Sequence, residues 1–353
     1  MYNCVKLGTL TRIRTGKLDA NASSTDGAYP FFTCSREVLR IATYSYDCEC
    51  VLVAGNGDLN VKYYAGKFDA YQRTYIIESI DKSKLLAKYL YFFLDIYVEV
   101  LRTQSIGGVI KYIKLGNLAD ALIPLPGIEK QAEIVDCLET CNVIIDRIQQ
   151  QLTKLDELVK SRFVELFGAL DANPYNWEIS KLNNFCDLQN GYAFKSGDYV
   201  ESSGVLNCRM SNIRPDGGFD SEYHPKFLPN EFWDQYREYR LNDGDVIIAM
   251  TDMASDPKIL GVPTIVRTNG KRFLLNQRVG KLTFYNAERI NNVYLMFVLS
   301  QKNIRQQLVK KAGGSTQINV GKPAILGIEF LVPPIELQEQ FAAFVAEVDK
   351  SKL

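Results

Sequence analysis

Residues 125–140 (LPGIEKQAEIVDCLET) and residues 332–347 (VPPIELQEQFAAFVAE) follow one pattern. Each stretch has a proline, then Ile-Glu-x-Gln, and then apolar residues at the spacing of one helix face. The two stretches lie 207 residues apart, and the chain ends a few residues after the second. The chain therefore begins a helix in the same way twice, which indicates an internal repeat.

Other short matches occur in the same order in both halves of the chain. They pair Lys6-Leu7 with Lys181-Leu182, Val51-Leu52-Val53-Ala54 with Val246-Ile247-Ile248-Ala249, Gln72-Arg73 with Gln277-Arg278, Tyr89-Leu90-x-Phe92-x-Leu94 with Tyr294-Leu295-x-Phe297-x-Leu299, and Gly107-Gly108 with Gly313-Gly314. The shift grows from 175 to 207 residues, as insertions in the second copy would cause. Six matches in order predict two related domains, each followed by a helix.

Each copy is predicted to be α+β, with a helix packed on a curved sheet. Short β-rich runs separated by Gly, Asn and Asp turns indicate the strands at 51–54 and 74–78, and at 245–250, 264–267 and 280–284. A helix is expected near 85–101 and again near 292–311. We predict a first domain at 1–127, a helix at 128–168, a second domain at 169–334 and a last helix at 335–353.

The helix after the first domain carries an apolar seam with alternating steps of three and four, which is typical of a coiled coil. The seam residues are Leu138, Cys141, Ile145, Ile148, Leu152, Leu155 and Val159. No Pro or Gly interrupts residues 129–167, and Gly168 is the expected stop. Such a helix is about 60 Å long, which favours a spacer over a helix lying on one domain core. Leu337, Phe341, Phe344 and Val348 repeat the seam, so we expect antiparallel pairing.

Composition excludes several classes of protein. A hydrophobic content of 46% with 23% charged residues is that of an ordinary globular chain, and no signal peptide or membrane span is predicted. We expect a cytoplasmic protein. Eight scattered cysteines without a CxxC pair and a single histidine do not suit a zinc site. A net charge of zero still allows local basic patches. No nucleophile, phosphate-binding or cofactor motif supports catalysis.

Taken together, these motifs make the chain resemble the DNA-specificity subunit of type I restriction–modification systems. The resemblance covers the whole chain, and a C-terminal piece of the family's pattern is expected to be missing from it. It rests on the repeated Pro-x-Ile-Glu-x-Gln, on residues 161–168 (SRFVELFG), 173–177 (NPYNW) and 177–182 (WEISKL), and on Ser211-Asn212-Ile213 and residues 244–248 (GDVII). It implies two target-recognition domains, each reading half of a bipartite DNA site. It also implies antiparallel coiled-coil helices that dock two adenine methyltransferase subunits.

Several further expectations come from this resemblance. The chain would be a non-catalytic specificity subunit without a cofactor, and S-adenosylmethionine would bind the partner methyltransferase. The family's second helix is normally longer, so the seam at Leu138, Cys141 and Ile145 is expected to be covered by a methyltransferase subunit or by a second copy. The alternative is that residues of the chain's own first domain cover it. Whether a restriction/translocase subunit joins is left open. Two alternatives remain: a fragment of a methyltransferase–specificity fusion, and a two-domain scaffold that binds protein or glycan.

Direct readout needs Arg, Lys, Asn and Gln side chains on loops that enter the major groove. In the first domain we expect a DNA-binding loop at 56–67, followed by Gln72-Arg73 and the Gly107-Gly108 turn. The candidates there are Lys62, Tyr63, Lys67, Gln72, Arg73, Gln104 and Lys111. In the second domain they are Arg209, Asn212, Arg214, Lys258, Arg272, Gln277, Arg278, Lys311, Thr316 and Gln317. Gln-Arg occurs in both copies, so its role is either architectural or base-reading.

Overall fold

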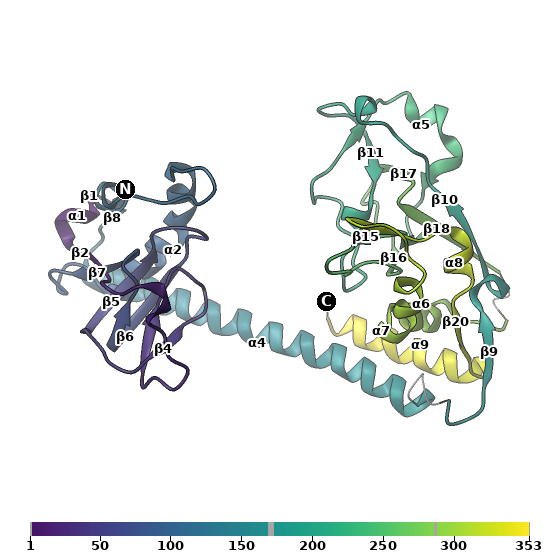
Figure 1. Cartoon of the computed structure of the whole chain (residues 1–353), viewed down its shortest axis with the longest axis horizontal. Helices are drawn as coiled ribbons and strands as arrows, with labels where there is room; N and C mark the ends of the chain where they lie inside the picture. The colour runs from purple at the N-terminus through teal and green to yellow at the C-terminus, as the bar shows by residue number, and fades with distance from the viewer. Residues whose placement is uncertain (1, 169–172, 286–287, 353) are drawn as a thin grey trace. The chain divides into compact units, whose positions relative to one another are not determined.

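The computed structural model describes residues 2–168, 173–285 and 288–352 and divides into two compact units, Met1–Gln150 and Gln151–Leu353. The long helix α4 (Ile128–Phe167) is continuous and gives residues to both units (Figure 1). The predicted division had set this helix apart as a segment of its own.

The first unit is a strongly curved sheet with one long helix packed against it. Its elements are β1 (Cys4–Lys6), α1 (Leu7–Leu10), β2 (Thr11–Thr15), the 3-10 turn η1 (Ala20–Ala22), β3 (Tyr29–Phe32), β4 (Leu39–Ile41), β5 (Tyr46–Ala54), β6 (Val61–Ala70), β7 (Thr74–Ser79), α2 (Ala87–Gln104), α3 (Leu115–Ala119) and β8 (Leu122–Pro124). Six strands form one sheet in the order β2-β7-β5-β6-β3-β4, and β1 pairs with β8.

The side chains of β5 alternate between the two faces of this sheet, and each face packs against its own core. Val51 and Val53 pack with Leu90 and Leu94 of α2, whereas the intervening Leu52 faces a second cluster that contains Phe68. Successive side chains of a strand point to opposite faces, so a strand between two cores is apolar throughout. The buried run from Cys50 to Ala54 therefore follows from a sheet curved around one core and covered by a helix on the other face.

The second unit contains two four-stranded sheets and more helices. Its elements are β9 (Glu178–Lys181), η2 (Leu182–Asn184), β10 (Cys186–Asn190), η3 (Ser196–Asp198), β11 (Val205–Cys208), η4 (Met210–Asn212), β12 (Phe227–Leu228), α5 (Phe232–Gln235), η5 (Arg237–Tyr239), β13 (Arg240–Leu241), β14 (Val246–Ala249), β15 (Thr251–Met253), β16 (Pro263–Ile265), β17 (Arg272–Leu275), β18 (Val279–Phe284), α6 (Asn292–Ser300), α7 (Lys302–Val309), β19 (Gln317–Asn319), α8 (Lys322–Leu326), β20 (Glu329–Val332) and α9 (Ile335–Lys350). The sheet orders are β10-β18-β14-β16 and β12-β11-β17-β13.

The predicted repeat is visible in the order of elements. The pair β9–β20 corresponds to β1–β8, and α8 follows its unit's helices as α3 follows α2. One expectation was wrong, because the helix predicted at 292–311 is broken into α6 and α7. Gln301 has an extended backbone, and the Ser300 hydroxyl donates to the Met296 and Phe297 carbonyls 2.9 and 2.8 Å away. Such back-bonding competes with the next helical turn.

Helix α9 packs antiparallel to the last part of α4, as predicted (Figure 1). Phe341 lies against Phe163 and Phe167, and just after the end of α9 the Lys352 ammonium pairs with an Asp156 carboxylate oxygen 2.9 Å away. Residue numbers thus rise along one helix as they fall along the other. Gly168 ends α4 with a φ of +68°, the left-handed conformation that favours glycine.

The glutamine of the repeated Pro-x-Ile-Glu-x-Gln is fully buried in both copies, as Gln131 and Gln338. The Gln131 side-chain oxygen accepts from the Leu86 N–H at 3.0 Å, and its amide nitrogen donates to the Lys84 and Pro126 carbonyls at 2.7 and 2.9 Å. Leu86 is the residue before α2, so Gln131 joins the first turn of α4 to the start of α2.

Gln338 makes the same three bonds in the second unit. It accepts from the Asn291 N–H at 2.9 Å, just before α6, and donates to the Arg289 and Pro333 carbonyls at 3.2 and 2.7 Å. An apolar side chain at this position would leave buried backbone groups without partners. The repeated motif therefore fixes each long helix to the helix of the domain that precedes it.

Across the described ranges, no helix combines the length and apolar character needed to span a membrane. All eight cysteines fall within these ranges and are free thiols. The described residues also contain no cluster of three His, Cys, Asp or Glu side chains arranged to hold a metal ion.

Candidate nucleic-acid interface

Three loops of the first unit are held together by backbone hydrogen bonds. The Gly55 N–H donates to the Arg73 carbonyl at 2.8 Å, the Ile113 N–H to the Gly55 carbonyl at 2.9 Å, and the Gly57 N–H to the Lys111 carbonyl at 2.9 Å. These bonds link the β5–β6 loop, the β6–β7 turn and the segment between α2 and α3. Segments up to 58 residues apart in the chain thus form one surface, which we call the first loop cluster.

The second unit repeats the first two of these bonds on equivalent residues and has a different third bond. The Met250 N–H donates to the Arg278 carbonyl at 2.9 Å, the Val320 N–H to the Met250 carbonyl at 3.0 Å, and the Ala254 N–H to the Thr316 carbonyl at 3.1 Å. Here β15 and β19 form a short antiparallel ladder where the first unit has the single bridge between Asn56 and Tyr112. We call this surface the second loop cluster.

Each loop cluster carries a tight hairpin built on one glycine. Ile106 and Tyr112 exchange two backbone hydrogen bonds of 3.0 and 2.9 Å, and Gly313 and Asn319 exchange two of 3.1 and 2.9 Å. One residue into each hairpin, Gly107 and Gly314 have φ values of +116° and +127°. A Cβ at either position would collide with the carbonyl oxygen three residues later, so only glycine fits.

This geometry corrects the predicted alignment of the two glycine pairs. Gly107-Gly108 had been matched to Gly313-Gly314, a shift of 206, whereas the equivalent residues are Gly107 and Gly314, a shift of 207. The corrected shift equals that of the helix-starting motif further along. The segment from the hairpin to the long helix is therefore the same length in both copies.

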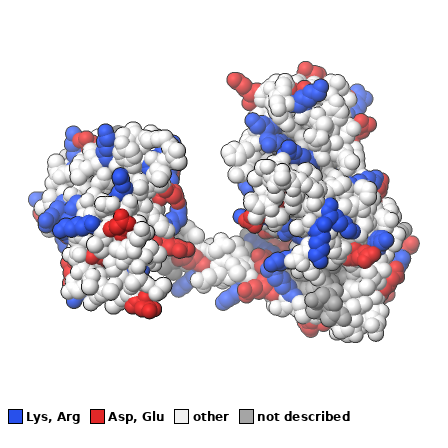
Figure 2. All heavy atoms as spheres, in the orientation of Figure 1, with Lys and Arg blue, Asp and Glu red and all other residues white. Residues whose placement is uncertain are grey.

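The exposed polar residues of the two loop clusters suit contact with DNA. In the first they are Gln72, Arg73 and Lys111, and in the second Gln277, Arg278, Lys311 and Thr316, with Gln317 partly exposed. Gln104 is also exposed, and its side-chain oxygen accepts from Asn117 at 3.1 Å. Figure 2 shows Lys and Arg side chains gathered in patches among acidic ones on the face drawn, so net neutrality conceals local positive charge.

The loop predicted at 56–67 is largely a strand, because β6 begins at Val61. Lys62 is half-buried, its ammonium donates to the Ser35 carbonyl and to Asn60, and burial lowers its pKa. Burial, together with a 2.8 Å hydrogen bond to Glu49, raises the pKa of Tyr63 to about 12. Lys67 is exposed, but it lies six residues along β6 from Val61, about 20 Å from the loop cluster.

Candidates in the second unit fall into two groups. Gln277, Arg278, Lys311, Thr316 and Gln317 belong to the second loop cluster, together with the exposed Lys258 on the insertion after β15. Asn212 is buried and both ends of its amide are used, accepting from the Arg209 N–H and donating to the Asp220 carbonyl, each at 2.8 Å. We therefore leave Asn212 out of the interface.

Three other arginines have places in the fold away from that cluster. Arg209 is half-buried beside the Asn212 turn. Arg214 pairs with Asp220 and stacks on Tyr223 at 4.1 Å, while the exposed Arg272 lies 5.5 Å over the Trp233 ring. Arg240 stacks on the same ring at 4.4 Å, and no short sequence pattern had predicted this arginine–aromatic group.

Two features of the loop clusters were not predicted from the sequence, where only polar residues had been considered. Asp252 is buried and accepts from the backbone N–H groups of Met253 and Leu260, both at 2.8 Å, so it shapes the insertion after β15. Val109 and Ile110 form an exposed apolar tip on the first hairpin. Their position beside a glycine turn was visible in the sequence, but only polar residues had been considered as DNA contacts.

Helix α4 leaves an apolar stripe exposed between its two packed ends. Leu138 and Leu152 are half-buried and Cys141 is exposed, while the exposed fractions of Ile145 and Ile148 are 61% and 49%. Val143 and Ile144, which the seam did not include, are about half exposed as well. Within the second unit Leu155 joins the core beneath α9, together with Val159 and Phe344.

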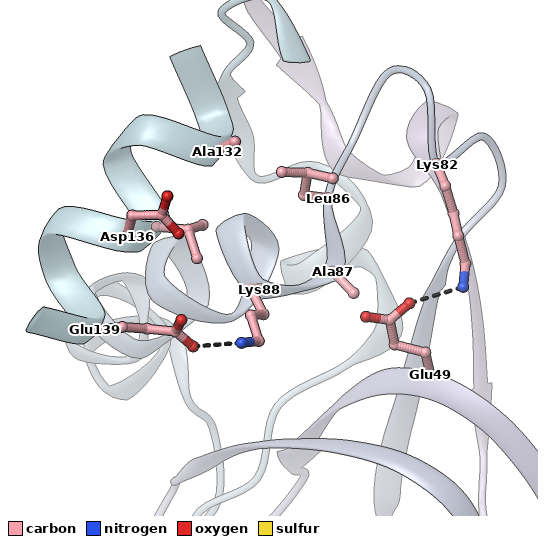
Figure 3. Close-up of a pocket in the computed structure, with 9 residues that line it drawn as sticks. Glu49, Lys82, Leu86, Ala87, Lys88, Ala132, Asp136 and Glu139 are labelled. Carbon is pink, nitrogen blue, oxygen red and sulfur yellow. Dashed lines mark hydrogen bonds and ion pairs between the residues drawn. The ribbon is translucent and has the colours of Figure 1, made fainter. Parts of the chain in front are cut away.

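Within the first unit, a pocket of about 200 Å³ lies between the first part of α4 and the start of α2 (Figure 3). Lys82 pairs with Glu49 at 2.7 Å and Lys88 with Glu139 of α4 at 2.6 Å, so two ion pairs frame it. The Lys82 ammonium and the Tyr63 hydroxyl keep the pKa of Glu49 low. A neighbouring hollow of about 350 Å³, lined in part by Tyr91 and Val143, continues along the same helix face.

Residues 2–157 and 174–353 match the family described as type I restriction modification DNA specificity domain. The specificity subunit of the Escherichia coli type I restriction enzyme EcoDI is 38% identical over 159 residues, 45% of this chain and 35% of that one. The MjaVIII specificity subunit of Methanocaldococcus jannaschii is 25% identical over 315 residues, 85% of this chain and 72% of that one.

A solved structure shares the fold. The crystal structure of a type I restriction–modification S subunit from M. genitalium covers all of this chain and 90% of its own, with a TM-score of 0.61 and 15% sequence identity. Its likeness supports two α+β domains joined by helices. The match to the EcoDI subunit, by contrast, spans only about a third of that protein.

Proposed function

This chain belongs to the type I restriction–modification DNA specificity family, and we propose that it is the non-catalytic specificity subunit of a complex that methylates adenine. Each unit would read one half of a bipartite double-stranded DNA site. The observation that carries this proposal is the repeated loop cluster. The same backbone bonds hold exposed Gln-Arg and Lys side chains beside a glycine hairpin in both units.

The backbone geometry separates two roles within each cluster. Arg73 and Arg278 use their backbone carbonyls to hold the loops together, a role that does not depend on the side chain. Their exposed guanidinium groups are left for phosphates, and the neighbouring Gln side chains for base edges. The backbone of the Gln-Arg dipeptide thus helps to hold the loops together, and its side chains remain available for binding.

A salt titration of DNA binding tests this role. Phosphate contacts make affinity fall steeply with salt, and each lost contact lowers the slope by about one. Arg73→Ala and Lys111→Ala should each weaken binding to all sequences and lower the slope. Lys67→Ala, a control at the far end of β6, should change neither. Equal effects from all three variants, or binding that ignores salt, would contradict a DNA interface at the loop clusters and favour a protein- or glycan-binding scaffold.

We also propose that the exposed stripe of α4 docks methyltransferase subunits, two per specificity subunit. S-adenosylmethionine would bind those subunits, and this chain would hold no cofactor. The stripe, the neighbouring hollow and the acidic Asp136, Glu139 and Asp146 offer a partner both apolar and charged contacts. Such a complex acts on genomic DNA, so we place the chain in the cytoplasm.

A further inference from the structure

The two hairpins share a backbone but differ at their tips. Both are closed by a reciprocal pair of backbone hydrogen bonds, and both place a glycine with positive φ at the next position. With the shift of 207, Val109 of the first hairpin corresponds to Thr316 of the second, and Ile110 to Gln317. One fold thus presents an apolar tip in one unit and a polar tip in the other.

The apolar tip is fully open to solvent. Val109 has an exposed fraction of 104%, Ile110 of 61%, and Ile106 at the base of 43%. The base is fixed, because the Lys111 carbonyl accepts from Gly57 and the Ile113 N–H donates to Gly55. Two branched apolar side chains that lie mostly exposed on a hairpin with a fixed base add little to the packing of this chain, so their position points to a ligand.

The surroundings of the tip favour DNA as that ligand. Lys111 follows it directly, and Arg73 is tied through Gly55 to Ile113 at the base of the same hairpin. Cationic groups beside a tip suit phosphates flanking an open groove. In the major groove the thymine 5-methyl is the apolar group that the bases display, and apolar side chains read it by contact.

We infer that Val109 and Ile110 read thymine 5-methyl groups in the half-site of the first unit. Thr316 and Gln317, at the equivalent positions, read base edges in the half-site of the second unit by hydrogen bonds. This inference rests on the proposed function and specifies how the same site works. It predicts that the half-site of the first unit contains at least one A·T pair whose thymine methyl contributes to affinity. Two copies of one hairpin would then recognise different sequences without a change of backbone.

Deoxyuridine tests the inference, because it lacks only the 5-methyl group. Methylome sequencing with the cognate methyltransferase first identifies the bipartite site, and exchange of residues 1–125 assigns a half to the first unit. The complex is then titrated with duplexes in which single thymines are replaced by deoxyuridine. We expect about a fourfold loss of affinity at a contacted thymine, the factor for removing one buried methyl. Replacements in the other half-site serve as the control.

Variants of the tip complete the test. In the Val109→Ala/Ile110→Ala complex, thymine and deoxyuridine duplexes should bind equally, and Val109→Ser/Ile110→Gln, which leaves no side-chain methyl group, should behave in the same way. Both changes are at exposed positions, and circular dichroism checks the fold. Wild-type affinity that ignores deoxyuridine, or a first half-site without an A·T pair, would overturn the inference while specific, salt-dependent binding still upheld the proposed function. Loss of methyltransferase binding with unchanged discrimination would assign the tip to a protein contact and overturn the inference.

Discussion

At the scale of single residues, the buried glutamines Gln131 and Gln338 explain why one sequence motif occurs twice. Each satisfies one backbone donor and two backbone acceptors that belong to different segments of its unit. Neither a periodic pattern nor composition could predict this, because a Gln at the start of a helix is ordinarily solvated. Only the tertiary contact shows that it is a structural residue.

Replacing Gln131 by Leu should destabilise the first unit by about 2–4 kcal/mol, since one backbone N–H and two carbonyls lose their buried partner. The shift of the urea unfolding midpoint measures this cost. Gln150→Leu is the matched control, because it makes the same exchange at an exposed position of α4. A cost below about 0.5 kcal/mol for Gln131→Leu would mean that water or a shifted backbone replaces the three bonds.

At the scale of elements, the sequence predicted the type and order of the helices and strands better than their exact positions. Both copies, the strands near Val51 and Val246 and the long helix ending at Gly168 are confirmed. The loop at 56–67 was wrong because Gly and Lys suggested a turn, whereas β6 pairs with β5 over eight residues. The glycine alignment was off by one because a sequence cannot say which of two glycines takes the positive φ.

The stripe on α4 is the element that we expect to bind a partner. Ile145→Glu places a charge on the stripe and should weaken methyltransferase docking by at least tenfold, since an apolar contact would have to bury a carboxylate. Gln150→Glu adds the same charge about 140° away around the helix and should not weaken docking. Analytical ultracentrifugation with the methyltransferase subunit measures both effects.

Two outcomes of that measurement would change the interpretation of the stripe. If the chain alone forms a dimer that Ile145→Glu dissociates, a second copy covers the stripe instead. If neither docking nor oligomeric state responds to Ile145→Glu, the stripe is not an interface. Alkylation of the exposed Cys141 gives an independent readout, because a docked partner should slow its reaction.

At the scale of the whole molecule, each unit has its own core and its own loop cluster. We therefore expect recognition to be modular. Exchanging residues 1–125 for the equivalent domain of a relative should change one half of the methylated motif and leave the other unchanged, as methylome sequencing would report. If both halves changed together, the two loop clusters would not act independently.

The last prediction concerns α4, whose 40 residues are the only continuous element shared by the two described units. If this helix sets the distance between half-sites, deleting residues 144–150 removes one heptad and about 10 Å of rise. A heptad changes helix rotation by only about 20°, so the helix faces on the two sides of the deletion stay nearly aligned. At about 3.4 Å per base pair, the gap in the methylated site should shorten by about three base pairs.

A deletion of five residues separates length from rotation. It removes about 7.5 Å but turns the rest of the helix by about 140°, so the helix faces on the two sides of the deletion no longer align. We expect the heptad deletion to retain specific methylation with a shorter gap and the five-residue deletion to abolish it. A gap that stays constant in both variants would show that α4 does not measure the site, and that each unit finds its half-site through the partner subunits instead.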